Sequence, residues 1–126
     1  MKTFTIESDK VYTSNYALAR KELPNRLLIG VSITAPEDFS DIQRIHELEP
    51  LQSTFIKWKN GDINAEQYKK EYVEGVLSKL NPTEVYEQTR GKVLLCYENR
   101  SQFCHRKLIT EWLREELGDN VVGVEL

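Results

Sequence analysis

The sequence predicts an α/β fold with three layers, Rossmann-like, in which a mainly parallel sheet lies between helices on both faces. Apolar runs rich in β-branched residues alternate along the chain with helical patterns, and the runs at residues 26–34 and 92–98 are apolar for most of their length. Such runs are typical of strands covered on both faces. Strands that alternate with helices imply right-handed crossovers in a parallel sheet. The 126 residues fit one domain, which we expect to span residues 1–126.

Short β-prone segments and helix boundary signals place the individual elements. The predicted strands are residues 10–13, 26–34, 92–98 and 120–126. The predicted helices are residues 15–22, 41–48, 51–60, 65–80, 83–88 and 102–117. The signals that begin or end these helices are Ser14, the Ser40/Gln43 and Asn64/Gln67 capping boxes, Ser101, and Gly118 at the last C-terminus.

Composition excludes several classes of function. Seventeen basic against twenty acidic residues give a net charge of -3, so we expect no general nucleic-acid binding. No run approaches the roughly 18 apolar residues of a membrane span, and the first residues, MKTFTIESDK, lack the apolar core of a signal peptide. We therefore expect a cytoplasmic protein without a membrane partner. Its two cysteines are too few for a disulfide framework, and we expect free thiols, metal ligands or redox groups.

The predicted fold indicates where a ligand would bind. Parallel α/β sheets bind ligands beyond the carboxyl ends of their strands, where the strand order reverses. The loops at that edge are residues 13–16, 32–39 and 98–106. None contains a GxGxxG or GxxxxGK[ST] pattern, so the usual dinucleotide and triphosphate sites are not supported. The sequence identifies no cofactor.

Polar chemistry concentrates in the third of these loops. Within eleven residues the chain carries two thiols, a carboxylate, an imidazole and a guanidinium, from Cys96, Glu98, Cys104, His105 and Arg106. Cys96 and Glu98 fall at the carboxyl end of the strand predicted at residues 92–98, and Cys104, His105 and Arg106 lie in the first turn of the helix predicted after it. A strand end and the start of the next helix border the same crevice, so we expect Cys96 and Cys104 to lie close together. A helix N-terminus would favour a thiolate at Cys104.

Four sequence segments resemble one known family. LLCYE at residues 94–98 and CHRKLITEWL at residues 104–113 are the specific ones, and KVYTSNYALARKEL at residues 10–23 and LLIGVSITAPEDF at residues 27–39 extend the match. On these segments the chain resembles the Domain of Unknown Function 488 family. The resemblance implies a small α/β fold with a shared site around these segments, and it brings no settled activity with it.

The residues are compatible with three classes of function. The first is a site for a small anionic, nucleotide-like ligand, in which a helix N-terminus and Arg106 hold the negative charge. If this site is catalytic, Cys104 is the nucleophile, and His105 or Glu98 transfers the proton. The ligand-binding residues would be Thr13, Ser14, Tyr16, Ser32, Cys96 and Arg106.

The second class is a zinc-like metal site, because Cys96, Glu98, Cys104 and His105 provide four suitable ligands. The adjacency of Cys104 and His105 argues against it, since neighbouring residues on a helix project about 100° apart. The third class is a non-enzymatic interaction or regulatory protein. Trp58 could then be a lid or a partner contact, whereas Tyr68 and Tyr72 have the spacing of a buried helix face.

Overall fold

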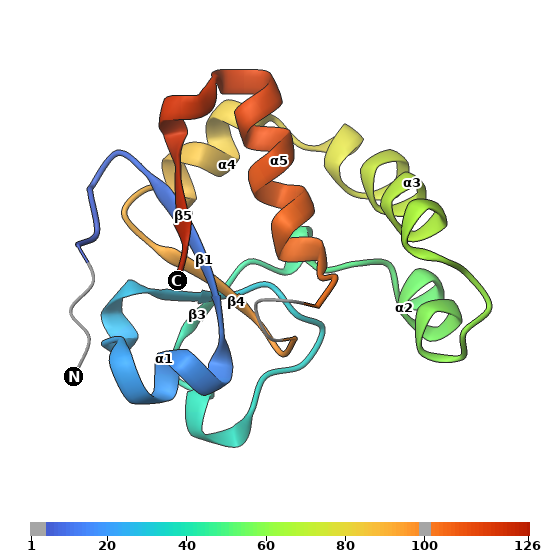
Figure 1. The fold of residues 1–126 in the computed structure, drawn as a ribbon, viewed down its shortest axis with the longest axis horizontal. Coiled ribbons are helices and arrows are strands. Elements are labelled where there is room, and N and C mark those ends of the chain that lie inside the picture. The colour runs from blue at the N-terminus through green and yellow to red at the C-terminus, as the bar shows by residue number, and fades with distance from the viewer. Residues whose placement is uncertain (1–4, 99–101) are drawn as a thin grey trace.

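The computed structural model describes residues 5–98 and 102–126, in which strands and helices alternate (Figure 1). The strands are β1 Val11–Asn15, β2 Leu28–Gly30, β3 Gln43–Arg44, β4 Val93–Cys96 and β5 Val122–Glu125. The helices are α1 Tyr16–Glu22, α2 Gln52–Lys59, α3 Ala65–Gly75, α4 Pro82–Thr89 and α5 His105–Leu117. In the part of the chain that the structure describes, no helix has the length and apolar character needed to cross a membrane.

All strand pairings in the sheet are parallel, and the strand order is β3-β2-β4-β1-β5. The sheet is therefore an α/β Rossmann-like sheet, as the sequence predicts. The central strand β4 places Val93 and Leu95 in one apolar cluster and Leu94 in another. This alternation follows from the two-residue period of a strand, and it covers both faces of the sheet.

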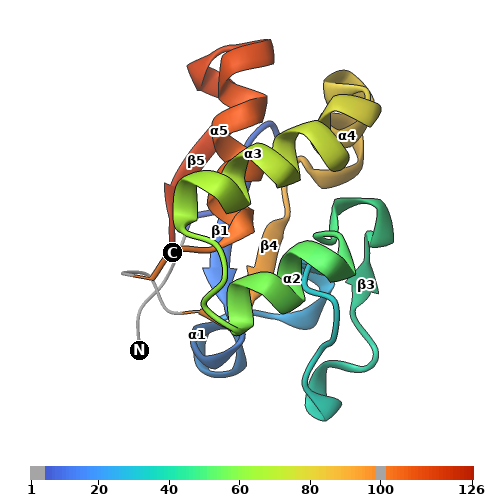
Figure 2. The ribbon, with the colours of Figure 1, turned by 90° about the vertical axis from the view of Figure 1, so that its right-hand side faces the viewer.

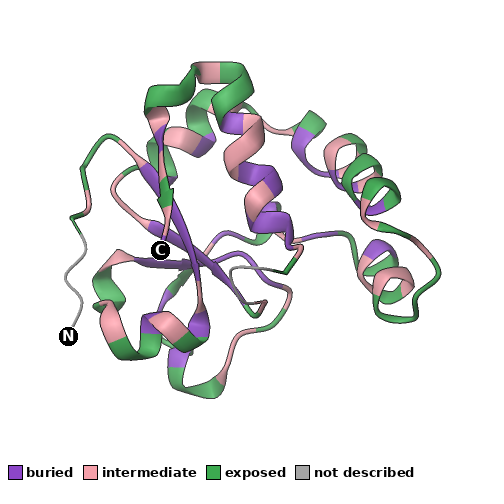
Figure 3. Ribbon diagram, viewed as in Figure 1, coloured by how far each residue is buried: buried purple, intermediate pink, exposed green. Residues whose placement is uncertain are grey.

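The two faces carry different helices. Tyr16 and Ala19 of α1 pack on the face of Val93 and Leu95. The other face is larger and packs against α3, α4 and α5, with Ile109 of α5 fully buried. Figure 3 shows the buried residues along the sheet and on the inner side of α5. Because α1 follows β1 on one face and α5 follows β4 on the other, the carboxyl ends of β1 and β4 border a crevice where the connections diverge.

Helices α2 and α3 lie side by side, as Figure 2 shows. Glu71 of α3 joins them, because its carboxylate accepts hydrogen bonds at 2.7 Å from both Thr54 and Lys57 of α2. The capping box predicted at Asn64 and Gln67 is confirmed at the start of α3. It aligns the first turn of α3 by satisfying two backbone N–H groups.

Several predicted boundaries are wrong. Ser14 is not the N-cap of α1: strand β1 runs on to Asn15, whose side chain caps the helix at the Leu18 N–H. Helix α3 ends at Gly75 and a separate 3₁₀ turn follows, so the predicted helix to residue 80 is two elements. The predicted strand at residues 26–34 is shorter, because regular strand geometry is limited to Leu28–Gly30.

The capping box predicted at Ser40 and Gln43 does not begin a helix. Residues Gln43–Arg44 pair with β2 as the edge strand β3, and a 3₁₀ turn follows at residues His46–Leu48. Pairing with the sheet therefore overrides the local helix signal. The Ser101 cap lies outside the described residues, and α5 begins at His105 with Cys104 as its N-cap.

Gly123 of β5 lies directly against the buried ring of Tyr12, which a Cβ at this position would overlap. Gly123→Ala should therefore lower the free energy of unfolding by about 1–3 kcal/mol, the usual cost of overpacking, as measured by urea denaturation. Val124→Ala is the matched control, because Val124 on the same strand is 70% exposed. If the two variants were equally stable, the Tyr12 ring would not pack tightly enough against residue 123 to exclude a Cβ.

Candidate functional site

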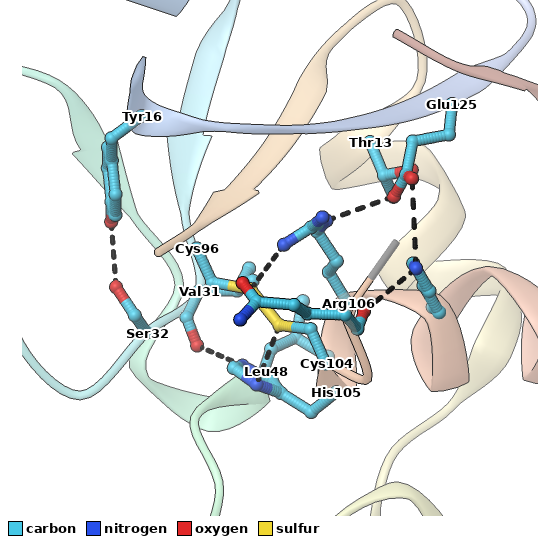
Figure 4. The surroundings of a disulfide bond; sticks show 12 residues. Thr13, Tyr16, Val31, Ser32, Leu48, Cys96, Cys104, His105, Arg106 and Glu125 are labelled. Atoms are coloured by element: carbon cyan, nitrogen blue, oxygen red, sulfur yellow. Dashed lines mark hydrogen bonds and ion pairs between the residues drawn. A yellow bond between two sulfur atoms is a disulfide. The ribbon is translucent and has the colours of Figure 1, made fainter. Parts of the chain in front are cut away.

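The two cysteines lie together at the carboxyl edge of the sheet, as predicted. Cys96 ends β4, Cys104 precedes the first turn of α5, and a disulfide bond joins them (Figure 4). The expectation of free thiols is therefore wrong for this structure. The chain returns to the same edge within eight residues, so the two sulfurs meet without any wider disulfide framework. Both cysteines are buried.

Arg106 lies behind the disulfide and is fully buried. Its Nη1 donates to Cys96 Sγ at 3.0 Å, and its Nε donates to Glu125 Oε1 at 3.1 Å. The same carboxylate oxygen accepts a hydrogen bond from Thr13 Oγ1 at 3.2 Å. The carboxylate of Glu125 thus compensates the buried positive charge, as buried charges require. The anion-binding role of Arg106 stays a prediction, and the partners of its guanidinium include a carboxylate and a sulfur.

His105 contacts the other sulfur of the pair. Its Nε2 lies 2.6 Å from the carbonyl oxygen of Val31, and its Nδ1 lies 3.7 Å from Cys104 Sγ. Burial is the main cause that lowers the pKa of His105 to about 4, so the ring is neutral at neutral pH. A carbonyl oxygen only accepts hydrogen bonds, so Nε2 carries the proton. The lone pair of Nδ1 therefore faces Cys104.

A small cavity of about 30 Å³ opens beside the disulfide, and both cysteines and His105 line it. Its polar walls include Ser32 and Glu98. Burial, together with the negative charge of Glu98, raises the pKa of Tyr68, which places that carboxylate close to the cavity's aromatic wall. The aromatic side chains around the cavity are Phe55, Trp58, Tyr68, Tyr97 and Phe103.

The predicted ligand-binding residues fall on two sides of the sheet. Thr13 reaches Glu125 and so belongs to the side of α5. Ser14 is fully buried. It is the next residue of β1 after Thr13, so its side chain faces the opposite side of the sheet. Tyr16 is on the side of α1, and its hydroxyl lies 2.7 Å from Ser32 Oγ. Ser32 alone of this set lines the cavity together with Cys96.

The structure adds residues that the sequence did not indicate. Phe103 is one of them, and it forms an aromatic wall with Trp58, the predicted lid or partner contact, with ring centroids 5.1 Å apart. Glu125 is the counter-ion of Arg106, although it lies 29 positions beyond Cys96 in the sequence. Arg44 donates to the carbonyl oxygens of Ser32 and Ile33 at 2.8 and 2.6 Å and thereby positions that loop. Only the alternation of polar and apolar residues in the last strand could have indicated Glu125.

Three side chains of the site also form a potential metal-ligand set. The ligand atoms of Cys96, Cys104 and His105 all lie within 4.8 Å of one another, and all three residues are buried. Cys104 is not part of the helix, because its backbone is extended, with φ -154° and ψ 147°. Its side chain can therefore point toward the same place as that of His105. The helical 100° separation that argued against a shared ion therefore does not apply.

The ion pair of Arg106 with Glu125 should contribute strongly to stability. Arg106→Met should lower the free energy of unfolding by about 3 kcal/mol, because it leaves a largely buried carboxylate without its main partner. The double variant with Arg106→Met and Glu125→Gln should be more stable than Arg106→Met alone by about 1 kcal/mol or more. Urea denaturation of the two single variants and of the double variant would measure this difference. Strictly additive effects would mean that the two side chains are not energetically coupled.

Comparison with known proteins gives one match, to a protein family. The model of the active DUF488-N3 subclade, DUF488-N3a, matches residues 11–117. This range includes both cysteines, His105 and Arg106, and it ends before Glu125. No curated protein and no solved structure matches the chain. The family model covers most of the sequence, and the chain therefore belongs to the DUF488 family.

Proposed function

We propose that this chain binds a small molecule at the carboxyl edge of its sheet and acts on it through the Cys96–Cys104 pair, which alternates between disulfide and dithiol. The observation that carries the proposal is the disulfide in the wall of the cavity, with a guanidinium on one sulfur and an imidazole nitrogen facing the other. The match to an active subclade supports an enzymatic role.

The surroundings favour thiol–disulfide exchange with a small thiol as the reaction. The thiolate of the substrate attacks Cys104 Sγ, the bond between the two protein sulfurs breaks, and its electron pair goes to Cys96. Arg106 Nη1, at 3.0 Å, then stabilises the Cys96 thiolate. A second substrate thiolate then attacks the substrate sulfur of the mixed disulfide, a bond forms between the two substrate sulfurs, and Cys104 leaves as a thiolate. The products are a disulfide of the two substrate molecules and a protein dithiol, which has gained two electrons and two protons.

Cys104 is the sulfur expected to carry the mixed disulfide. It precedes α5, whose first-turn N–H groups and positive dipole end favour negative charge nearby. Cys96 is the better leaving group because Arg106 already donates to its sulfur. Arg106 does not serve as an anion-binding group in this proposal, since Glu125 neutralises it.

The aromatic wall restricts what can reach the sulfurs. The cavity holds about 30 Å³, which is room for little more than a water molecule. Trp58 belongs to α2 and is half-buried at the cavity, so access for a substrate requires α2 to move. Glu71 couples such a movement to α3 through its contacts with Thr54 and Lys57.

Reduction of the folded protein tests the proposal. In glutathione buffers of increasing reducing strength, alkylation followed by mass spectrometry should show both cysteines becoming reactive in one two-electron transition, while the far-UV circular dichroism is unchanged. Cys96→Ser should trap glutathione on Cys104, because the resolving thiol is missing. Cys104→Ser should trap less glutathione on Cys96. Reduction that occurs only in denaturant would contradict the proposal, as would equal trapping by the two variants.

The contact of Arg106 with Cys96 predicts a shift of this equilibrium. A charge-assisted hydrogen bond contributes about 1.5–3 kcal/mol, so loss of the guanidinium should raise the glutathione ratio needed for reduction about 10- to 100-fold. Arg106→Met combined with Glu125→Gln is the suitable variant, because it leaves no unpaired buried charge. Glu125→Gln alone is the control. An unchanged equilibrium in the double variant would show that Arg106 does not stabilise a thiolate.

A further inference from the structure

We infer that the reduced site binds one zinc ion through Cys96 Sγ, Cys104 Sγ and His105 Nδ1, with a fourth position that faces the cavity. The inference rests on the proposed function in one respect only, namely that the pair also exists as a dithiol. It does not require thiol exchange to occur. The disulfide is then the oxidised, metal-free state of the same site.

The orientation of His105 is that of a metal ligand. Metal-bound histidines usually donate their second ring N–H to a carbonyl or carboxylate, which fixes the tautomer and aims the other nitrogen at the metal. In this chain Nε2 donates to the Val31 carbonyl oxygen at 2.6 Å. Nδ1 is the remaining nitrogen, and it lies 3.7 Å from Cys104 Sγ. The supporting hydrogen bond is therefore in place before any metal binds.

The distances between the ligand atoms suit a tetrahedral ion. All three atoms lie within 4.8 Å of one another. In a tetrahedral site with Zn–S bonds of about 2.3 Å, two sulfurs are about 3.7 Å apart. The Nδ1 to Cys104 Sγ distance of 3.7 Å already has this scale, so the main change on cleavage of the disulfide is the separation of the two sulfurs. Cys96 ends a strand and Cys104 precedes a helix, and neither lies within a helical turn.

Electrostatics favour a divalent cation in the reduced state. Two thiolates carry a charge of about -2 in total, which Zn²⁺ neutralises. Arg106 and Glu125 already neutralise each other behind the site. Arg106 Nη1 donates to Cys96 Sγ at 3.0 Å, and it can keep this hydrogen bond to a metal-bound thiolate. No uncompensated charge would then remain in this buried region.

The fourth position indicates what the ion could do. Two cysteines and one histidine are three protein ligands, and catalytic zinc sites have three protein ligands plus a water or substrate. The cavity beside these ligands has about 30 Å³, enough for a water molecule. Glu98 also lines this cavity, but its carboxylate is not among the ligand atoms that lie within 4.8 Å of one another. Its part in the site would therefore be to accept a proton from zinc-bound water. The ligand class is therefore a borderline-soft divalent metal at an open site.

Cobalt titration of the reduced protein tests this inference. The protein would be purified under anaerobic, reducing, metal-free conditions and titrated with Co²⁺, whose absorption reports thiolate ligands and tetrahedral geometry. We expect saturation at one equivalent and displacement of Co²⁺ by one equivalent of Zn²⁺. Cys96→Ser, Cys104→Ser and His105→Gln should each weaken Co²⁺ binding at least tenfold. His46→Gln is the matched control, because His46 is exposed and contacts Glu49 away from the cysteines.

The outcomes separate the metal site from thiol exchange. Reduced, folded protein that binds no Co²⁺, or His105→Gln that binds Co²⁺ as tightly as the wild type, would overturn the inference and leave the exchange reaction untouched. Because the protein is purified in the reduced state, a disulfide that does not exchange would not prevent the titration. If His105→Gln fails to fold, the two serine variants decide the result. The oxidised protein should bind no Co²⁺ at one equivalent.

Discussion

The fully buried charge of Arg106 is the constraint on which the rest of the site depends. A guanidinium without solvent requires partners of compensating charge and polarity. Two strands provide such partners directly, and a third strand hydrogen-bonds one of them. Glu125 comes from β5, Cys96 from β4, and Thr13 of β1 hydrogen-bonds the same Glu125 oxygen. Hydrogen bonds to and around Arg106 thus join α5 to the strands β1, β4 and β5. They also hold the guanidinium against the sulfur of Cys96.

The two-residue period of the strands decides which predicted residues can act together. Cys96 shares the face of Leu94, which is the face covered by α5, so its side chain meets Cys104 and Arg106. Thr13 lies on the same face and Ser14 on the other. A ligand bound at the disulfide would therefore be surrounded by α5, α2 and the loop after β2. The hydroxyl of Tyr16 would affect it only through its hydrogen bond to Ser32.

Sequence patterns predicted the elements whose local and tertiary preferences agree. The central strands and the capped start of α3 at Asn64 are of this kind. Ser14 failed as a cap because Asn15 is an equally good cap one residue later, and pairing with β4 extends β1 to that residue. The helix after Ser40 failed because an edge of the sheet was available to Gln43. The sequence predicted that the two cysteines lie close together, but neighbouring thiols can be free or bonded, so the disulfide itself was not predictable.

The partners of Arg106 and His105 could not be predicted because they depend on contacts between residues far apart in the sequence. His105 donates to Val31, 74 positions earlier, and Arg106 pairs with Glu125, 19 positions later. These contacts also determine what reduction of the disulfide would require. A disulfide is neutral, and the adjacent ion pair is neutral as well. Reduction adds two electrons to a buried region of low polarity, where unbalanced charge is costly. Two protons or one divalent cation must therefore accompany reduction of the disulfide. Either would bind at the sulfurs, and the unprotonated Nδ1 of His105 faces Cys104 Sγ.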